Sequence, residues 1–341
     1  MKKNIELQSG MEHQRKHDHI DKAFESQTNI QNKDQRFYYE PMMSGHKQDI
    51  VLPFSFQNKK MLFPMWISSM TGGTSLAKRI NINFAKACKK YGLGMGLGSC
   101  RQLLSSDEHL VDFQVRNYCG DEVPLFANLG IAQVEQLIKE GKTSLIDDLV
   151  TKLEVDGLFV HINPLQEYLQ PEGDRFREKP IDTITRLFDK VKFPIGIKEV
   201  GQGMGPRSIE ALAKLPLACL ELASYGGTNF SRIEQLRSNC PIEHDVKSAF
   251  VNLGHSAEEM INYINDIDNI SFPIIISGGI KSALDAYFLI QKCQSPAIYG
   301  IASRALKPAL SGYDDLCKFI ELEIEAINIA YSLLDIKRDV L

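Results

Sequence analysis

Residues 157–174 read Gly157-Leu-Phe-Val-His161-Ile-Asn163-Pro-Leu-Gln166-Glu167-Tyr-Leu-Gln-Pro171-Glu-Gly-Asp174. The apolar run at the start of this segment has the length of a buried strand. Four polar side chains follow within a few positions: His161, Asn163, Gln166 and Glu167. Such side chains lose hydration at the end of a buried strand, which is costly unless they bind something. In a barrel of alternating strands and helices the active site lies at that end of the strands.

The composition limits the possible classes of protein. The chain has 341 residues, is 43% hydrophobic and carries a net charge of −4. It can therefore bury a large core, and it lacks the global basic field of a nucleic-acid-binding protein. Its apolar runs are shorter than the roughly 20 residues that span a bilayer, so we expect no membrane partner and no signal peptide. Seven scattered cysteines without a C-x-x-C pair predict a reducing, cytoplasmic location.

Strand-like apolar runs recur along the chain, and helical patterns separate them. Helices are expected at 75–91, about 132–141, 207–214 and 281–292, with a long amphipathic C-terminal helix at 311–334. A hairpin from 50–56 and 60–63 is expected at the bottom of the barrel. The pattern predicts an α/β fold, a parallel (β/α)₈ or TIM barrel, over an open doubly wound sheet, which rarely needs eight units. The expected strands are 64–70, 94–99, 124–130, 157–162, 194–200, 218–224, 272–280 and 296–303.

Two regions are expected along the chain. Residues 1–36 are polar and should form a mobile N-terminal arm, whereas residues 37–341 should form the barrel. Within the arm lies Arg15-Lys16-His17-Asp18-His19. This run is either a solvated charge cluster or a flap whose cations neutralise a phosphate.

The residues at the strand ends suggest a phosphorylated cofactor. Gly226-Gly227 and Gly278-Gly279 follow two late strands, where many barrels hold a phosphate on backbone N–H groups. Lys198 could be a Schiff-base nucleophile, a cation beside an electron-rich ring, or half of a structural ion pair. The glycine-rich run 94–98 should let a ligand approach the backbone. Together these features describe a site for flavin mononucleotide (FMN).

Glu167 and Gln166 allow several interpretations. Glu167 could be a general base, a metal ligand or a surface charge, and a neighbouring phosphate site favours Mg²⁺. Gln166 does not titrate, so it would orient a substrate or donate a hydrogen bond. Glu172 and Asp174, in the loop that follows, could equally be solvated charges.

With these residues in view, the chain resembles the type 2, flavin-dependent isopentenyl-diphosphate isomerases. The likeness covers nearly the whole chain, from residue 15 to about residue 303. Its most discriminating part is the block from His161 to Glu167. The motifs that carry it are Arg15-Lys16 with His19, Ser69-Met70-Thr71-Gly72-Gly73, Gly98-Ser99-x-Arg101, Asn128-Leu-Gly130, His161-x-Asn163-x-x-Gln166-Glu167, Pro171-Glu-Gly-Asp174, Lys198-Glu199-Val200, Gly226-Gly227-Thr228 and Ser277-Gly278-Gly279-Ile280.

The resemblance implies an enzyme that interconverts isopentenyl and dimethylallyl diphosphate in isoprenoid biosynthesis. It implies reduced FMN as acid and base, Mg²⁺ on Glu167, NADPH as the reductant and a homo-oligomer, a tetramer or octamer. Gln166, His161, Asn163 and Lys198 would be catalytic. The substrate would contact Arg15, Lys16, His19, Arg101 and Gln166. The flavin would contact Ser69, Met70, Thr71, Ser99, Asn128, Lys198, Ser224, Thr228, Gly278, Gly279, Ile280, Ala302 and Ser303.

The sequence departs from the family pattern at three places. His17 stands where an acidic residue is usual, Glu178-Lys179 replaces a Gly-Trp element, and Leu222-Ala223-Ser224-Tyr225 differs from the usual lead-in to the glycine pair. Two other functions share the barrel and its phosphate turns. One is an FMN oxidoreductase of the α-hydroxy-acid oxidase or IMP dehydrogenase kind, and the other is a flavin-binding barrel without catalysis.

Overall fold

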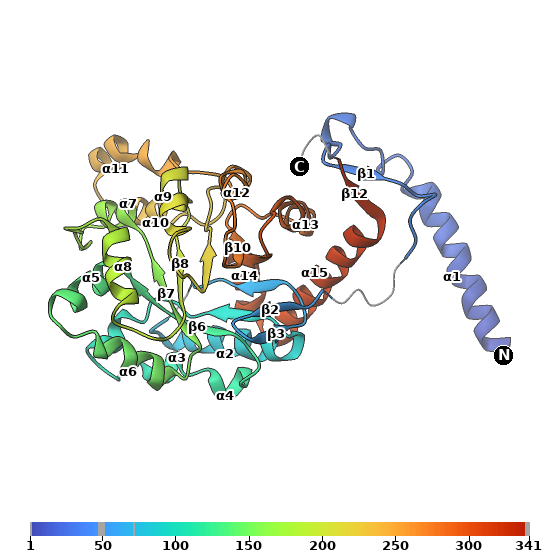
Figure 1. Cartoon of the computed structure of the whole chain (residues 1–341). Helices are drawn as coiled ribbons and strands as arrows, with labels where there is room; N and C mark the ends of the chain where they lie inside the picture. Colours follow the sequence, from blue (N-terminus) through green and yellow to red (C-terminus); the bar gives the residue numbers. More distant parts are fainter. Residues whose placement is uncertain (1, 47–51, 71, 338–341) are drawn as a thin grey trace.

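The chain folds into a closed barrel of eight parallel strands surrounded by helices (Figure 1). The computed structural model describes residues 2–46, 52–70 and 72–337, and the side chains of residues 11 onward within these ranges. The closed order of the strands confirms the predicted (β/α)₈ barrel over the open sheet. Around the barrel the strands are β4 (Met65–Ile67), β5 (Gly94–Gly96), β6 (Leu125–Gly130), β7 (Gly157–His161), β8 (Ile195–Lys198), β9 (Cys219–Glu221), β10 (Ile274–Ser277) and β11 (Ala297–Ile301).

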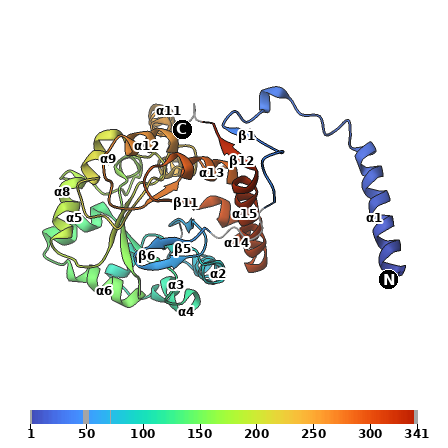
Figure 2. The same cartoon turned by 45° about the vertical axis from the view of Figure 1, so that its right-hand side comes forward.

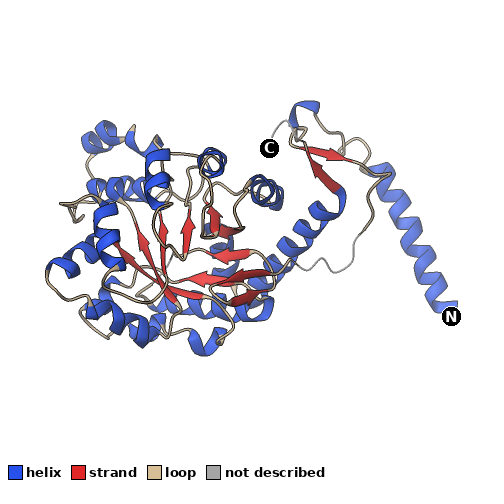
Figure 3. Cartoon of the chain, viewed as in Figure 1, coloured by secondary structure: helices blue, strands red, loops and turns tan. Residues whose placement is uncertain are grey.

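Helices connect the strands and cover the outside of the barrel (Figure 3). All the predicted helices are present, and α14 occupies a stretch that the sequence did not assign to a helix. The helices of the barrel are α2 (Ser75–Tyr91), α3 (Leu110–Phe113), α4 (Arg116–Cys119), α5 (Ile131–Lys139), α6 (Ser144–Leu153), α7 (Pro164–Leu169), α8 (Pro180–Phe188), α9 (Pro206–Leu212), α10 (Phe230–Arg237), α11 (Pro241–Lys247), α12 (Ala257–Asn265), α13 (Ala283–Lys292), α14 (Ser303–Ser311) and α15 (Tyr313–Leu333).

Local capping groups explain where several helices begin and end. Helix α2 starts at Thr74, whose hydroxyl accepts a hydrogen bond from the Ala77 N–H, and stops at Gly92 in the left-handed conformation. Helices α12 and α13 each open with a capping box, built on Ser256 and Ser282. These signals fix the helices that flank the late strands, and thereby the turns that follow those strands.

Aromatic rings fill the lower part of the barrel interior. Trp66, Phe126 and Phe159 point inward from three strands and are fully buried, with ring centroids 5.2–6.0 Å apart. A β-carbon on Gly94 would lie 2.3 Å from the Trp66 ring, and one on Gly196 would lie 2.7 Å from the Phe159 ring. The expectation that the glycine-rich strand admits a ligand is therefore wrong at Gly94, because the chain's own indole occupies that space.

The predicted hairpin closes the amino-terminal end of the barrel. Strands β2 (Phe54–Phe56) and β3 (Lys59–Met61) pair antiparallel, and residues 50 and 51 of the prediction lie outside the described ranges. Phe56 packs against Trp66 at 4.9 Å between ring centroids. Lys59 Nζ reaches Asp156 at 2.6 Å, just before β7. With this end sealed, the carboxyl ends of the strands are left as the open end of the barrel.

The N-terminal segment, for which the sequence predicted a mobile arm, begins with a regular helix. Helix α1 (Lys2–Asp21) is rich in Lys, Glu and Gln and contains no proline, a composition that favours a helix. Figures 1 and 2 show α1 standing apart from the barrel. After it, β1 (Phe37–Tyr39) pairs antiparallel with β12 (Leu334–Ile336), and Arg36 binds Asp285 on α13 at 2.9 Å. Arg36, at which the predicted arm ends, thus contacts α13 directly before the β1–β12 pair.

None of the helices in the described ranges has the length and apolar character needed to cross a bilayer.

Candidate active site

Polar side chains lie at the carboxyl ends of five neighbouring strands. His161 Nδ1 on β7 lies 2.8 Å from Asn128 Oδ1 on β6, so the imidazole N–H donates to the amide oxygen. Lys198 on β8 is the register neighbour of both His161 and Glu221, which ends β9. Glu221 in turn accepts a hydrogen bond from the hydroxyl of Ser277 on β10 at 3.1 Å. The fold therefore brings together the predicted residues Asn128, His161 and Lys198.

His161 is electrically neutral at physiological pH. Burial, together with the nearby charge of Lys198, lowers the pKa of His161 from 6.5 to about 3. A neutral imidazole can donate through Nδ1, as it does to Asn128, but cannot serve as a proton donor of ordinary histidine strength. The structure thus supports a positioning role for His161.

Lowering the pH from 7 to 5 is expected to reduce the free energy of unfolding through His161. Its folded pKa is depressed, so below pH 6.5 the unfolded chain takes up a proton that the folded chain refuses. The loss grows to about 2 kcal/mol at pH 5 and continues to about pH 3. Urea unfolding of the wild type and of His161→Asn at both pH values measures it. An identical pH dependence in the two proteins would contradict the assignment.

Lys198 is a buried cation without a carboxylate partner. Its Nζ donates to the Glu199 carbonyl at 2.8 Å, and it forms no ion pair with any carboxylate in the described ranges. The Glu199 carboxylate points elsewhere, accepting backbone N–H groups of the following loop, among them those of Gly201 and Gln202. An unpaired buried charge is costly to maintain, so Lys198 is suited to an anionic or electron-rich ligand.

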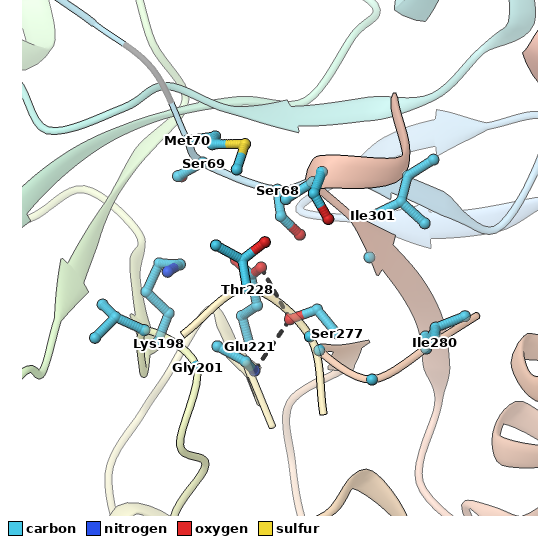
Figure 4. A pocket seen from close by; sticks show the side chains of 18 of the residues that line it. Ser68, Ser69, Met70, Lys198, Gly201, Glu221, Thr228, Ser277, Ile280 and Ile301 are labelled. Atoms are coloured by element: carbon cyan, nitrogen blue, oxygen red, sulfur yellow. Dashed lines mark hydrogen bonds between the residues drawn. The ribbon is translucent and has the colours of Figure 1, made fainter. Parts of the chain in front are cut away.

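A cavity of about 610 Å³, including its open mouth, lies beside Lys198 at the ends of β8 to β11 and β4 (Figure 4). We call it the strand-end cavity. Gly278 and Gly279 line it in the left-handed conformation, at φ of 81° and 73°. A β-carbon on Gly278 would lie 2.1 Å from the Ser224 carbonyl oxygen, which explains the glycine. The predicted flavin residues that line this cavity are Ser69, Met70, Lys198, Thr228, Gly278, Gly279, Ile280, Ala302 and Ser303.

Three predicted flavin residues have other surroundings. Ser99 lines a separate hollow with Arg101. Asn128 is buried against His161, and the Ser224 hydroxyl donates to the carbonyls of Ser277 and Gly278, each at 2.8 Å. Ser224 therefore stabilises the turn after β10, while Ala223 takes the place in the cavity wall. The fourth, Thr71, lies outside the described residues.

The donor groups of the strand-end cavity fit a phosphorylated cofactor. The hydroxyls of Ser68 and Ser69 are buried in its wall and have no hydrogen-bond partner in the described ranges. Helix α14 begins at Ser303 in the same wall, and Arg304 follows it with one guanidinium nitrogen, Nη1, unpartnered. A helix N-terminus, backbone turns and a guanidinium are the groups that proteins use to bind a phosphate.

A second polar cluster lies on the short helix α7, directly after β7; we call Asn163, Gln166, Glu167 and Asp174 the α7 cluster. Asn163 Nδ2 donates to Glu167 Oε1 at 2.9 Å and to Gln166 Oε1 at 3.1 Å. The backbone N–H of Asp174 donates to Glu167 Oε2 at 2.6 Å. The Glu167 carboxylate is thus held in one orientation, and the residue is only 8% exposed. Arg175 donates to the backbone carbonyl of Glu167, and among the described residues no cationic side chain pairs with its carboxylate.

The α7 cluster offers a metal only a partial set of ligands. No group of three or more His, Cys, Asp or Glu side chains suited to a metal ion occurs in the described ranges. Mg²⁺ commonly binds one or two carboxylates and takes its other ligands from water and substrate phosphates. Glu167 fits that arrangement, in which a diphosphate would complete the coordination.

Glu234 on α10 is a site residue that the sequence did not single out. Its Oε1 accepts from Gln166 Nε2 at 3.2 Å, and Arg237 pairs with its other oxygen. The Gln166 amide is therefore held at both ends, because its nitrogen donates to Glu234 and its oxygen accepts from Asn163. The signal that marks Glu234 is its burial, since a charged side chain on a helix is rarely only 5% exposed. This burial results from the packing of α10 on α7 and so could not be seen in the sequence.

Arg101 joins the α7 cluster at its outer edge. Its guanidinium binds Asp174 at 2.8 Å, and Gln133 on α5 donates to the same carboxylate oxygen. Asp174 is therefore a structural link between three elements and not a solvated charge. Glu172, in the same loop, is exposed and pairs with Arg237 at 2.7 Å.

The structure does not bring Arg15, Lys16 and His19 to the strand ends. All three lie on α1, which stands apart from the barrel (Figure 2). Arg15 and Lys16 are exposed, and the neighbouring His17 pairs with Asp21 one turn along the same helix at 2.8 Å.

Comparison with solved structures finds the same barrel fold in other proteins. A mandelate oxidase variant matches with a TM-score of 0.54 at 11% identity, covering 89% of this chain and 88% of that one. A flavocytochrome b2 variant matches with a TM-score of 0.60 at 15% identity, covering 87% of this chain and 72% of that one. At these identities the likeness shows the barrel fold alone.

Comparison with curated proteins is more specific. No protein-family model matches the chain. The isopentenyl-diphosphate delta-isomerase of Rickettsia felis is 32% identical over 320 residues, which cover 93% of this chain and 91% of that protein. The enzyme of the same name from Rickettsia typhi is 31% identical over 93% of this chain and 92% of its own length. The chain therefore belongs to the isopentenyl-diphosphate delta-isomerase family.

Proposed function

We propose that this protein interconverts isopentenyl and dimethylallyl diphosphate, using reduced FMN in the strand-end cavity and Mg²⁺ on Glu167. The observation that carries the proposal is the pairing of two sites at one end of the barrel. One is a cavity with an unpaired buried cation, Lys198, and the other is the α7 cluster with an oriented carboxylate. The first suits a flavin, and the second suits a metal-bound diphosphate.

Different residues of the strand-end cavity would bind the phosphate and the ring of the flavin. Gly278, Gly279 and the start of α14 would hold the phosphate, with Arg304 beside them. Lys198 would lie near the ring, where its charge stabilises an electron-rich reduced state. When bound and reduced, flavin supplies a nitrogen that can donate and accept a proton.

The protein's own groups would orient the substrate and handle its protons. Moving a double bond by one position needs one proton added and another removed, without net redox change. His161 is neutral and donates to Asn128, so it would position neighbours and leave proton transfer to others. Gln166 would orient the substrate or a water molecule, and the Glu234 carboxylate bound to it is a titratable group in direct contact. Asn163 would hold both Gln166 and Glu167 in place.

Changing both Arg15 and Lys16 to Ala is expected to raise the KM for isopentenyl diphosphate at least tenfold, without altering flavin content. Both cations would contact the diphosphate, together with His19 and Arg101, after α1 covers the strand ends of its own barrel or of a second copy. Steady-state kinetics and the flavin absorbance of the purified variant measure the two quantities. Lys22→Ala, which removes an exposed cation just after the end of α1 at Asp21, is the control. An unchanged KM in the double variant would contradict the flap.

We also propose the reductant, the cellular location and the assembly of the enzyme. NADPH would supply the electrons that keep the flavin reduced. The protein would act in the cytoplasm as a homo-oligomer, a tetramer or octamer, on a small diphosphate substrate and without a nucleic-acid partner.

One experiment separates the isomerase from the FMN oxidoreductase that shares its barrel. In one arm the purified protein is given FMN, Mg²⁺, NADPH and isopentenyl diphosphate without oxygen. In the other arm it is given FMN, a panel of 2-hydroxy acids and an electron-accepting dye, with no NADPH present. We expect isomer in excess of both enzyme and NADPH consumed, and no dye reduction. Dye reduction by a hydroxy acid without isomer formation would assign the protein to the oxidoreductases.

A further inference from the structure

Glu221 is a buried carboxylate that neither the family motifs nor the predicted site includes. It ends β9 after Cys219 and Leu220, is 1% exposed, and lines the strand-end cavity. A carboxylate at such a position in an apolar strand loses nearly all its hydration. Buried carboxylates are retained where they gain partners, so the question is what Glu221 binds.

Within the protein only one oxygen of Glu221 has a partner. Oε1 accepts from the Ser277 hydroxyl at 3.1 Å, while the Ser277 oxygen itself accepts from the Ala223 N–H at 3.0 Å. Oε2 is buried and has no hydrogen-bond partner in the described ranges. Lys198 is the register neighbour on β8, but its Nζ donates to the Glu199 carbonyl instead. One carboxylate oxygen is therefore free for a ligand.

The surroundings of Glu221 select the kind of ligand. Figure 4 shows oxygens of Ser68, Glu221, Thr228 and Ser277 gathered in the middle of the cavity wall. The glycine at position 300 leaves room for these side chains, because a β-carbon there would lie 2.7 Å from Ser68 Oγ and 2.8 Å from Ser277 Cβ. A carboxylate repels phosphate and accepts from neutral donors, and hydroxyls beside it can both donate and accept. This combination matches a chain of hydroxyl groups.

We propose that Glu221 binds the hydroxyl groups of the ribityl chain and so selects flavins that carry this chain. The proposal rests on FMN binding in the strand-end cavity. It adds that the negative charge of Glu221 lies between the ring and phosphate subsites. The repulsion would keep the phosphate on the glycine turns, at Gly278 and Gly279, and thereby fix the direction in which the cofactor binds.

Binding of three flavins tests the proposal directly. FMN has ring, ribityl chain and phosphate; riboflavin lacks the phosphate; lumiflavin lacks both chain and phosphate. Fluorescence titration of Glu221→Gln should give Kd values about tenfold higher than wild type for FMN and riboflavin, and unchanged for lumiflavin. Glu135→Gln, another buried carboxylate but on α5 outside the cavity, should leave all three unchanged.

A second measurement changes the ligand by one hydroxyl group at a time. Riboflavin analogues lacking the 2′, 3′ or 4′ hydroxyl are titrated into the wild type, and at least one should bind about tenfold more weakly than riboflavin. That analogue and riboflavin should differ less in their affinity for Glu221→Gln than for the wild type, because the neutral amide oxygen is a weaker acceptor than the carboxylate.

The outcomes separate this inference from the proposed function. An equal loss of all three flavins in Glu221→Gln, or no loss of any, would overturn the role of Glu221 while leaving FMN binding intact. Undiminished binding of every deoxy analogue to the wild type would also overturn it. Failure of the wild type to bind FMN at all would overturn the cofactor assignment, and this inference with it.

Discussion

Replacing Lys198 with Ala should lower kcat/KM for isopentenyl diphosphate by about 100-fold or more and weaken FMN binding. Lys198 is the buried cation of the strand-end cavity, and no carboxylate in the described ranges neutralises it. Its removal takes away the charge that would stabilise an electron-rich ring. Kinetics under anaerobic conditions and flavin titration measure the two effects.

A spectroscopic readout distinguishes this role from a general effect on folding. The charge of Lys198 contributes to the low pKa of His161, so the pKa of His161 should rise above about 3 in Lys198→Ala. Histidine NMR titration follows it. Lys59→Ala removes a cation paired with Asp156 at the opposite end of the barrel and should change neither flavin binding nor His161. A Lys198→Ala protein with wild-type turnover and flavin affinity would contradict the assignment.

Changing Glu167 to Gln is expected to reduce kcat/KM by a factor of about 100 to 1,000 and to shift the Mg²⁺ requirement to higher concentration. The substitution keeps the size of the side chain but removes the negative charge that would bind the metal. It also places an amide N–H₂ against Asn163 Nδ2 or the Asp174 N–H, both of which are donors. Activity measured across a range of Mg²⁺ concentrations reports the metal effect separately.

The neighbouring loop supplies the matched control for this variant. Glu172 is an exposed carboxylate that pairs with Arg237, so Glu172→Gln should keep wild-type activity and the wild-type Mg²⁺ requirement. If Glu167→Gln loses activity but keeps the Mg²⁺ requirement of the wild type, Glu167 is a structural residue of the α7 cluster and not a metal ligand.

The sequence predicted the parts of the fold that depend on local patterns. Apolar runs and helical spacing located the strands of the barrel, because each buries its side chains on both faces. Helix α2 was predicted at its observed bounds, since Thr74 and Gly92 mark its ends. The N-terminal helix α1 was missed because its side chains form no apolar stripe, and only its composition favours a helix.

Some residues of the candidate site could likewise be predicted from the sequence, whereas others could not. Lys198 ends a strand, and the glycine turns and Glu167 come shortly after strands, so all of them could be recognised by position along the chain. The partner of Gln166 could not, because Glu234 is 68 residues away and reaches it only through the packing of α10 on α7. Ser224 and Ala223 are adjacent, and backbone geometry at φ of 42° for Ala223 decides which of them faces the cavity. Glu221 is a single charge inside an apolar strand, a signal that is visible in the sequence, but it belongs to none of the family motifs.

In the proposed reaction this chain moves a double bond by adding one proton and removing another. The most direct test is an anaerobic incubation in D₂O with chemically reduced FMN, Mg²⁺ and isopentenyl diphosphate, followed by NMR. We predict dimethylallyl diphosphate in excess over enzyme, with deuterium from the solvent in the product and no net oxidation of the flavin. Unchanged isopentenyl diphosphate, or a product formed only as the flavin is oxidised, would contradict the account.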